Sequence, residues 1–192
     1  MPDDRTEAWD RQQIHDVVLR YCQGIDRLDM ELVRSAYHPD GVDHHTGFDG
    51  TVDEFVSWVS QPLAEHLAGT MHVIGNHRVE LFGDEALSET YLTAVHWGTD
   101  PGSPASFTTG ARSVDHMTFS AGRWGIAERW AVREWLRPEG GVLAPAYGAG
   151  PQARRDGADP VQVLRERLTA RARAVGSADS GRSAEPPRPR GS

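Results

Sequence analysis

The 192-residue chain contains no lysine, and all 20 of its basic residues are arginine. The absence of lysine excludes Schiff-base catalysis and a phosphate-binding loop that depends on a lysine side chain. The single cysteine, Cys22, has no partner for a disulfide within the chain. No run of about 18 apolar residues is present, so we expect no membrane-spanning helix. The polar, acidic N-terminus is unlike a secretion signal, and we therefore expect a cytoplasmic protein.

Charge is unevenly distributed along the chain. Residues 1–147 carry 11 arginines and 23 acidic residues, whereas residues 148–192 carry nine arginines and five acidic residues. An acidic body disfavours nucleic acid, which is bound through basic side chains that face the phosphates. The basic segment contains no aromatic side chain on which a base could stack. We therefore expect neither a nucleic-acid partner nor a membrane partner.

The hydrophobic pattern predicts helices first and strands afterwards. Helical spacing predicts three helices, at 6–27, 29–37 and 51–67, and a short strand at 42–46 lies among them. From residue 70 onward apolar and polar residues alternate, which predicts four long strands at 70–82, 86–97, 107–119 and 123–136. Hairpin turns join the first pair and the last pair, and a longer connection at 100–104 joins the middle strands. This order predicts an α+β domain in which helices pack on one face of a curved antiparallel sheet.

The chain is predicted to hold one domain with flexible ends. The domain spans 8–138, after a flexible N-terminus at 1–7. The segment 139–192 is rich in Gly, Ala, Pro and Arg, with a possible helix at 160–175 and otherwise a disordered composition. Large apolar residues scattered over the strands suggest a homodimer or homotrimer that forms through the outer face of the sheet.

Asp26 lies on the apolar stripe of the first predicted helix, four residues after Cys22 and eight after Val18. A carboxylate buried on such a stripe needs a partner or a raised pKa. The alternative is that the stripe has ended and Asp26 is solvated at the helix end. Tyr21, on the same stripe, is either a hydrogen-bond donor near Asp26 or a packed core residue.

His72 and Asn76 share one face of the strand 70–82 and would be interior polar groups if that face is concave. Histidine is the natural proton shuttle near neutral pH. The alternative is that His72 is a surface residue or a core residue with satisfied hydrogen bonds. Arg129 lies between small residues on the last strand, where its charge could hold an anionic oxygen. The alternative for Arg129 is a solvent-facing position.

No motif for a metal or a cofactor is present. His44 and His45 are adjacent on a strand and point to opposite faces, so they cannot easily share one ion. The chain has no HExxH, no cysteine cluster, no GxGxxG after a strand and no GxSxG. We therefore predict no metal and no cofactor. Tryptophans near the sheet suggest an aromatic-lined cavity for a flat, apolar ligand. The predicted substrate-binding residues are Asn76, His45, Trp97, Trp58 and Trp130.

The combined pattern resembles the SnoaL-like branch of the nuclear transport factor 2-like superfamily over residues 8–138. The resemblance rests on the segments Tyr21-x4-Asp26, Tyr37-His-Pro-Asp-Gly41, Met71-His72-x3-Asn76 and Gly122-Arg-Trp124-x4-Arg129. It implies a cone-shaped curved sheet packed against three helices, with an internal pocket. Members include scytalone dehydratase, bile acid 7α-dehydratase, lindane dehydrochlorinase and polyketide cyclases.

The resemblance also implies a chemistry. Asp26 and His72 match an Asp–His dyad in which the histidine removes a proton from carbon, and Tyr21 and Arg129 match assisting residues. The helix-one lysine of the dehydrochlorinase has no counterpart, which disfavours halide elimination. We expect a cofactor-free dehydratase acting on a hydrophobic, carbonyl-containing substrate of polyketide-like or polycyclic type. The alternatives are a cyclase or isomerase using the same pocket, and a non-catalytic assembly subunit like the β subunit of a ring-hydroxylating dioxygenase.

Overall fold

The computed structural model describes residues 6–98, 106–138, 150–151, 157–158 and 160–180. The predicted connection at 100–104, most of the predicted flexible N-terminus and most of 139–159 lie outside these residues. Of the stretch predicted to be disordered after residue 175, residues 181–192 also lie outside, whereas 176–180 are helical. None of the described helices is long and apolar enough to cross a membrane.

Three helices precede most of the sheet, as the periodicity predicts. They are α1 (Glu7–Arg27), α2 (Met30–Ala36) and α3 (Val52–His66). Thr6 caps α1 by accepting the Trp9 amide, and Asp29 caps α2 by accepting the Leu32 amide. A capping box between Thr51 and Glu54 starts α3. Each helix therefore begins where a side-chain acceptor is available for its free amides.

The sheet has six strands in the order β2-β1-β6-β5-β4-β3. They are β1 (Tyr37–His45), β2 (Phe48–Thr51), β3 (Gly69–Phe82), β4 (Glu85–Trp97), β5 (Phe107–Ser120) and β6 (Arg123–Pro138). The four long strands form the predicted antiparallel meander, and Gly83 and Gly122 supply the positive φ of its hairpin turns.

One feature of the predicted sheet is wrong. β1 pairs with β6 in the parallel direction, so the sheet is mixed rather than wholly antiparallel. β1 also begins directly at Tyr37, earlier than the strand predicted at 42–46, and its register shifts between Tyr37 and Val42. The α+β class and the curved sheet packed against three N-terminal helices are confirmed.

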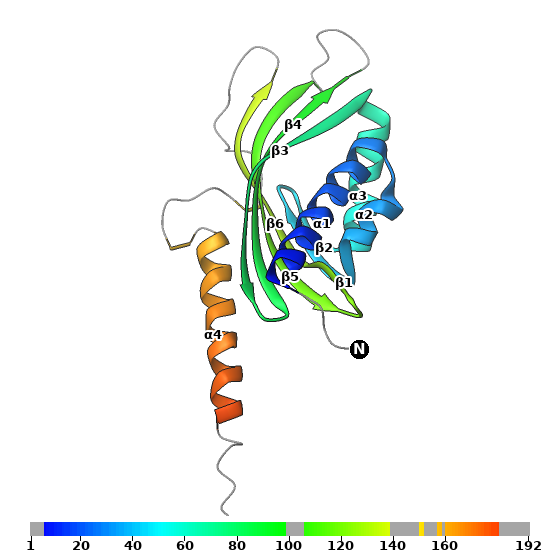
Figure 1. Ribbon diagram of the computed structural model, residues 1–192. Coiled ribbons are helices and arrows are strands. Elements are labelled where there is room, and N and C mark those ends of the chain that lie inside the picture. Colours follow the sequence, from blue (N-terminus) through cyan, green and yellow to red (C-terminus); the bar gives the residue numbers. More distant parts are fainter. Residues whose placement is uncertain (1–5, 99–105, 139–149, 152–156, 159, 181–192) are drawn as a thin grey trace, which may run out of the picture.

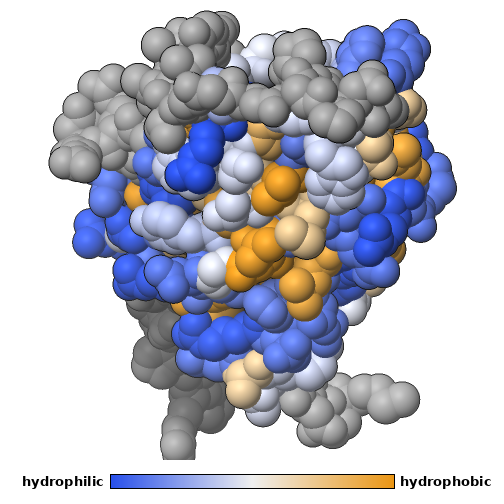
Figure 2. All heavy atoms as spheres, turned by 90° about the horizontal axis from the view of Figure 1, so that it is seen from above, coloured by the Kyte–Doolittle hydropathy of each residue, from blue (hydrophilic) through white to orange (hydrophobic). Residues whose placement is uncertain are grey.

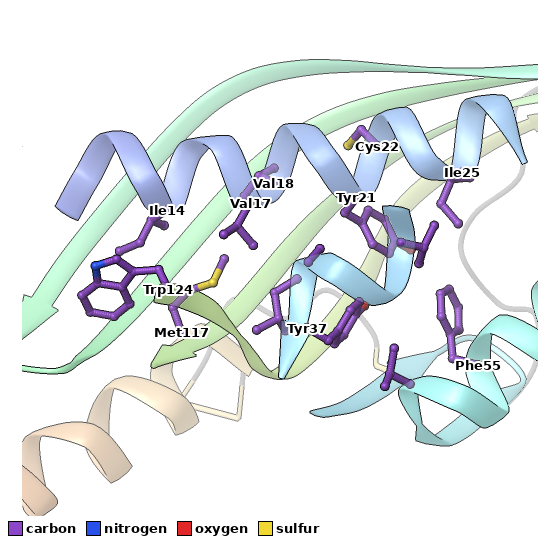
Figure 3. Close-up of a cluster of buried hydrophobic side chains, with 14 of the residues drawn as sticks. Ile14, Val17, Val18, Tyr21, Cys22, Ile25, Tyr37, Phe55, Met117 and Trp124 are labelled. Carbon is purple, nitrogen blue, oxygen red and sulfur yellow. The ribbon is translucent and has the colours of Figure 1, made fainter. Parts of the chain in front are cut away.

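The main hydrophobic core lies between α1–α3 and the inner face of the sheet (Figure 1). The α1 stripe is buried along its length, from Ile14 to Ile25. In Figure 3, Tyr21 points from α1 toward Tyr37 and Phe55, and its ring lies about 6 Å from each of theirs. These contacts hold the C-terminal half of α1, which carries Asp26, against the sheet.

A second hydrophobic cluster lies on the outer face of the sheet. There α4 (Pro160–Ser180) packs against β3, β4 and β5, opposite the other helices (Figure 1). Leu164 and Leu168 are fully buried in this cluster, and Arg165 pairs with Glu80 at 2.7 Å. The sequence predicts contact between copies through the outer face, and α4 covers part of that face.

Candidate active site

The structure brings Asp26 and His72 together at the end of α1. Asp26 lies in the last turn of α1, and His72 lies on β3, an edge strand of the sheet. The carboxylate accepts the backbone N–H of His72 at 2.9 Å and meets the imidazole Nδ1 at 2.7 Å. An edge strand leaves backbone N–H groups without a strand partner, and Asp26 supplies one for His72. The same carboxylate therefore fixes both the backbone and the ring of His72.

The bond to Asp26 decides which nitrogen of His72 is available. A carboxylate accepts hydrogen bonds, so Nδ1 carries the hydrogen and Nε2 holds the free lone pair. No hydrogen bond to Nε2 occurs among the described residues. The two side chains are only 12% and 15% exposed, so the pair is largely shielded from solvent. This is the arrangement that a general base requires.

His72 faces a partly open cavity of about 150 Å³ between the inner face of the sheet and the helices. Its polar lining includes His45, His96 and Arg133, and its apolar lining comes mainly from β4 and β5. The lining residues are Tyr21, His45, Thr46, His72, Leu92, Ala94, His96, Phe107, Thr109, Ala111, Arg112, Ser113, Ala131 and Arg133. A proton acceptor, a cation and an apolar wall therefore meet around one space.

His96 lies beside His72 and is held neutral. Its ring stacks on Phe107 with the centroids 4.1 Å apart, and it meets the ring of His72 edge-on at 6.2 Å. Burial, and then the nearby His72, lower the pKa of His96 to about 4. Near neutral pH His96 is therefore an uncharged wall of the cavity.

Arg129 does not reach the cavity, in contrast to the role predicted for it. Its side chain is fully buried and forms a two-pronged ion pair with Asp115, at 2.7 and 2.8 Å. The guanidinium lies over the ring of Tyr21, 4.0 Å from the ring centroid. Asp115 lies opposite Arg129 in the β5–β6 register. Its carboxylate accepts from Nε and Nη2 of Arg129, the two donors that would otherwise bind a substrate anion.

Two arginines line the cavity: Arg112 forms ion pairs with Glu89 and Glu134, and Arg133 is the other. Arg133 lies on β6 four residues after Arg129, so alternation places it on the same face of the strand. Burial lowers the pKa of Arg133, and no ion pair to it occurs among the described residues. A guanidinium without a counter-ion is available for an anionic oxygen. The alternation along β6 places Arg133 on the same face as Arg129. The two differ because Asp115 forms an ion pair with Arg129.

The other predicted site residues fall into two groups. Tyr21 and His45 line the cavity, and burial followed by the charge of Asp43 raises the pKa of Tyr21 well above its usual value. Asn76 is exposed, beside an irregularity between Ile74 and His77 in the β3–β4 pairing. The three predicted tryptophans lie away from the cavity lining: Trp58 and Trp97 are 41% and 43% exposed, and Trp130 stacks on His44.

A larger cavity, of about 810 Å³, is bordered by His44, Trp130 and the start of α4, and His45 lines it as well as the smaller cavity. Neither Asp26 nor His72 lines the larger cavity.

Seen from above in Figure 2, hydrophobic residues gather near the middle of the surface and hydrophilic residues surround them. Among the residues that the structure describes, no group of three or more His, Cys, Asp or Glu is placed to hold a metal ion.

A family model for the SnoaL-like domain matches residues 6–130, and the chain belongs to this family. No curated protein matches the sequence. A candidate scytalone dehydratase from Novosphingobium aromaticivorans is 16% identical, with a TM-score of 0.61 over 76% of this chain and 93% of that one. A hexachlorocyclohexane dehydrochlorinase from Novosphingobium barchaimii is 16% identical, with a TM-score of 0.60 over 73% and 94%.

A candidate aromatic ring hydroxylase from Novosphingobium aromaticivorans is also similar, at 16% identity and a TM-score of 0.56 over 65% of this chain and 89% of that one. At such identities the solved structures show a shared fold. The family match and these neighbours therefore establish the fold of this chain, and the activities named for the neighbours are their own. The fold also hosts other functions, so the reaction must be argued from the site itself.

Proposed function

We propose that the protein is a cofactor-free lyase that removes a proton next to a carbonyl group and eliminates water. The single observation that carries this proposal is the Asp26–His72 pair, whose imidazole presents Nε2 to a partly open cavity. Asp26 orients the ring and stabilises the imidazolium that forms when the ring takes a proton. His72 is the base, and Asp26 is its positioning residue.

The rest of the cavity supports the same chemistry. Removing a proton next to a carbonyl places negative charge on the carbonyl oxygen, and Arg133 is the lining residue best suited to stabilise it. Tyr21 keeps its proton, because burial raises its pKa, and it can donate a hydrogen bond. In this proposal Arg133 takes the role that the sequence assigns to Arg129.

The size of the cavity bears on the substrate class. A cavity of about 150 Å³ in an engineered protein holds benzene, so the cavity here, also about 150 Å³, accommodates one ring. We therefore propose a hydrophobic carbonyl compound with one ring seated beside His72. An isomerase would use the same first step, because it also begins with proton removal next to a carbonyl.

The experiment that tests the proposal measures proton removal directly. Cyclohexanone is incubated in D₂O with the protein, and the exchange of its hydrogens next to the carbonyl is followed by proton NMR. The wild-type protein is expected to accelerate exchange, and His72→Ala is expected to lose about a hundred- to ten-thousandfold of that rate. Circular dichroism verifies that the variant is folded. Equal exchange rates for a folded His72→Ala and the wild type would overturn the proposal.

A further inference from the structure

A second histidine–carboxylate pair faces the same cavity and is not used by the proposed base. Asp43 and His45 are two residues apart on β1, so their side chains leave the strand on the same side. Asp43 is fully buried and forms a short contact with His45 Nδ1. Its other oxygen accepts the hydroxyl of Tyr37 at 2.5 Å. A buried carboxylate thus has a partner on each oxygen, as its burial requires.

The hydrogen on His45 can be assigned from these contacts. Burial, followed by the charge of Asp43, raises the pKa of Tyr37 well above its usual value, so Tyr37 keeps its hydrogen and donates it. Asp43 accepts at both oxygens, and the hydrogen between Asp43 and His45 therefore belongs to Nδ1. No hydrogen bond to Nε2 of His45 occurs among the described residues. Nε2 is consequently the nitrogen that can exchange a proton with a ligand.

The ring of His45 is held in place and borders the same space as His72. It stacks on Phe55 of α3 with the centroids 4.8 Å apart and the planes 20° apart. It is 25% exposed, and it lines the cavity of about 150 Å³ together with His72. The two histidines share one design, in which a carboxylate holds Nδ1 and leaves Nε2 unbonded.

Elimination of water from a β-hydroxy ketone needs two proton transfers. A base removes the proton next to the carbonyl, and an acid protonates the hydroxyl group, because hydroxide is a poor leaving group. We propose that His45, held by Asp43, is this second acid–base residue and donates its Nε2 proton to the departing hydroxyl. The inference rests on the proposed elimination.

The step balances without a further reactant. The C–H bond breaks and its proton moves to Nε2 of His72, while its electron pair forms the C=C bond. The C–O bond breaks, and its oxygen leaves as water with the proton from Nε2 of His45. His72 finishes protonated and His45 neutral, and proton exchange with solvent restores both. Asp43 accepts from Nδ1–H of His45 and stabilises the protonated ring before the transfer.

The test separates the two proton transfers by the choice of leaving group. The substrates are β-hydroxycyclohexanone, which loses hydroxide, and β-acetoxycyclohexanone, whose acetate needs no protonation to leave. The variant is His45→Asn, since the asparagine amide can still donate to Asp43 but has no counterpart of Nε2. The control is His44→Asn, on the same strand, where the side chain points to the other side and stacks on Trp130. Ultraviolet absorbance of cyclohexenone reports both reactions.

His45→Asn is expected to lose at least about a hundredfold in the rate of hydroxide elimination and less than about tenfold with acetate. His44→Asn is expected to match the wild type with both substrates. Equal losses for the two substrates, or no loss for either, would overturn the role of His45 and leave the proposed lyase intact if cyclohexanone exchange still requires His72. A wild-type protein that catalyses neither exchange nor elimination overturns both proposals.

Discussion

Two ion pairs on the inner side of the sheet, Asp115–Arg129 and Asp26–His72, differ in whether a polar atom remains accessible to a ligand. Asp115 and Arg129 are fully buried and joined by two parallel hydrogen bonds, and Nη1 of Arg129 is buried with no hydrogen-bond partner among the described residues. Asp26 and His72 are each partly exposed, and Nε2 of His72 has no hydrogen bond to any described residue and faces a cavity. The difference teaches that a buried charged pair indicates chemistry only where a reactive atom remains accessible. We call Asp115–Arg129 the closed pair and Asp26–His72 the open pair. The closed pair is suited to stabilising the fold, and the open pair is suited to proton transfer.

The largest expected effect is the loss of stability when the closed pair is broken. Asp115→Asn leaves the guanidinium of Arg129 buried without its counter-charge, and we expect the free energy of unfolding to fall by about 3–5 kcal/mol. Urea denaturation followed by tryptophan fluorescence measures the change. The matched variant Asp26→Asn is expected to lose only about 1–2 kcal/mol, since its site is partly exposed. A smaller loss for Asp115→Asn than for Asp26→Asn would contradict the comparison.

The next effect concerns His96, which meets no carboxylate in the part of the chain that the structure describes. Burial, and then the nearby His72, lower the pKa of His96 to about 4, from 6.5 for an ordinary histidine. Between these two values the unfolded chain binds a proton that the folded protein does not, so the free energy of unfolding falls as the pH drops. The full contribution is about 3 kcal/mol.

The measurement compares urea denaturation at neutral pH and near pH 4.5 for three proteins. His96→Gln is expected to lose less stability on acidification than the wild type, because it lacks the ring that must stay neutral. The exposed His66→Gln serves as the control and is expected to follow the wild type. If all three proteins lose stability equally, the assignment to His96 is wrong.

The open pair is tested by the same carboxylate-to-amide change used for the closed one. Asp26→Asn removes the charge that stabilises protonated His72, and the amide can hold the ring in the wrong tautomer. We expect the rate of cyclohexanone exchange in D₂O to fall at least about a hundredfold. Asp26→Glu, which restores a carboxylate at a displaced position, is expected to recover part of the rate. An Asp26→Asn variant with full exchange activity would remove the distinction between the two pairs.

The smallest expected effect separates the two arginines of β6. Arg133→Gln removes one of the two arginines that line the cavity, and we expect kcat/KM for β-hydroxycyclohexanone to fall about tenfold, a loss of roughly 1.4 kcal/mol. Stability is expected to change little, because no ion pair to Arg133 occurs among the described residues. Arg137→Gln, an exposed position on the same strand, is the control. Unchanged kinetics for Arg133→Gln would remove it from the site.

Much of the fold could be predicted because it depends on local patterns. The periodicity predicts the order of helices and strands, and the capping residues Thr6 and Asp29 lie at the starts of α1 and α2. Only the family resemblance predicted that Asp26 and His72 lie in contact. The Asp43–His45 pair was missed, although an acid and a histidine two residues apart on a strand share a face, which is a signal available in the sequence.

The sequence by itself determined which segments become helices and strands, because periodicity and capping act over a few residues. It also determined that a carboxylate would end the apolar stripe of α1. Only the tertiary structure decided which arginine is open to the cavity, through the placement of Asp115 opposite Arg129 and the irregularities of the β5–β6 pairing. It also decided that β1 joins β6 in parallel, and that Asp43 accepts from Tyr37. These features depend on strand register, which is set by packing between residues far apart in the chain.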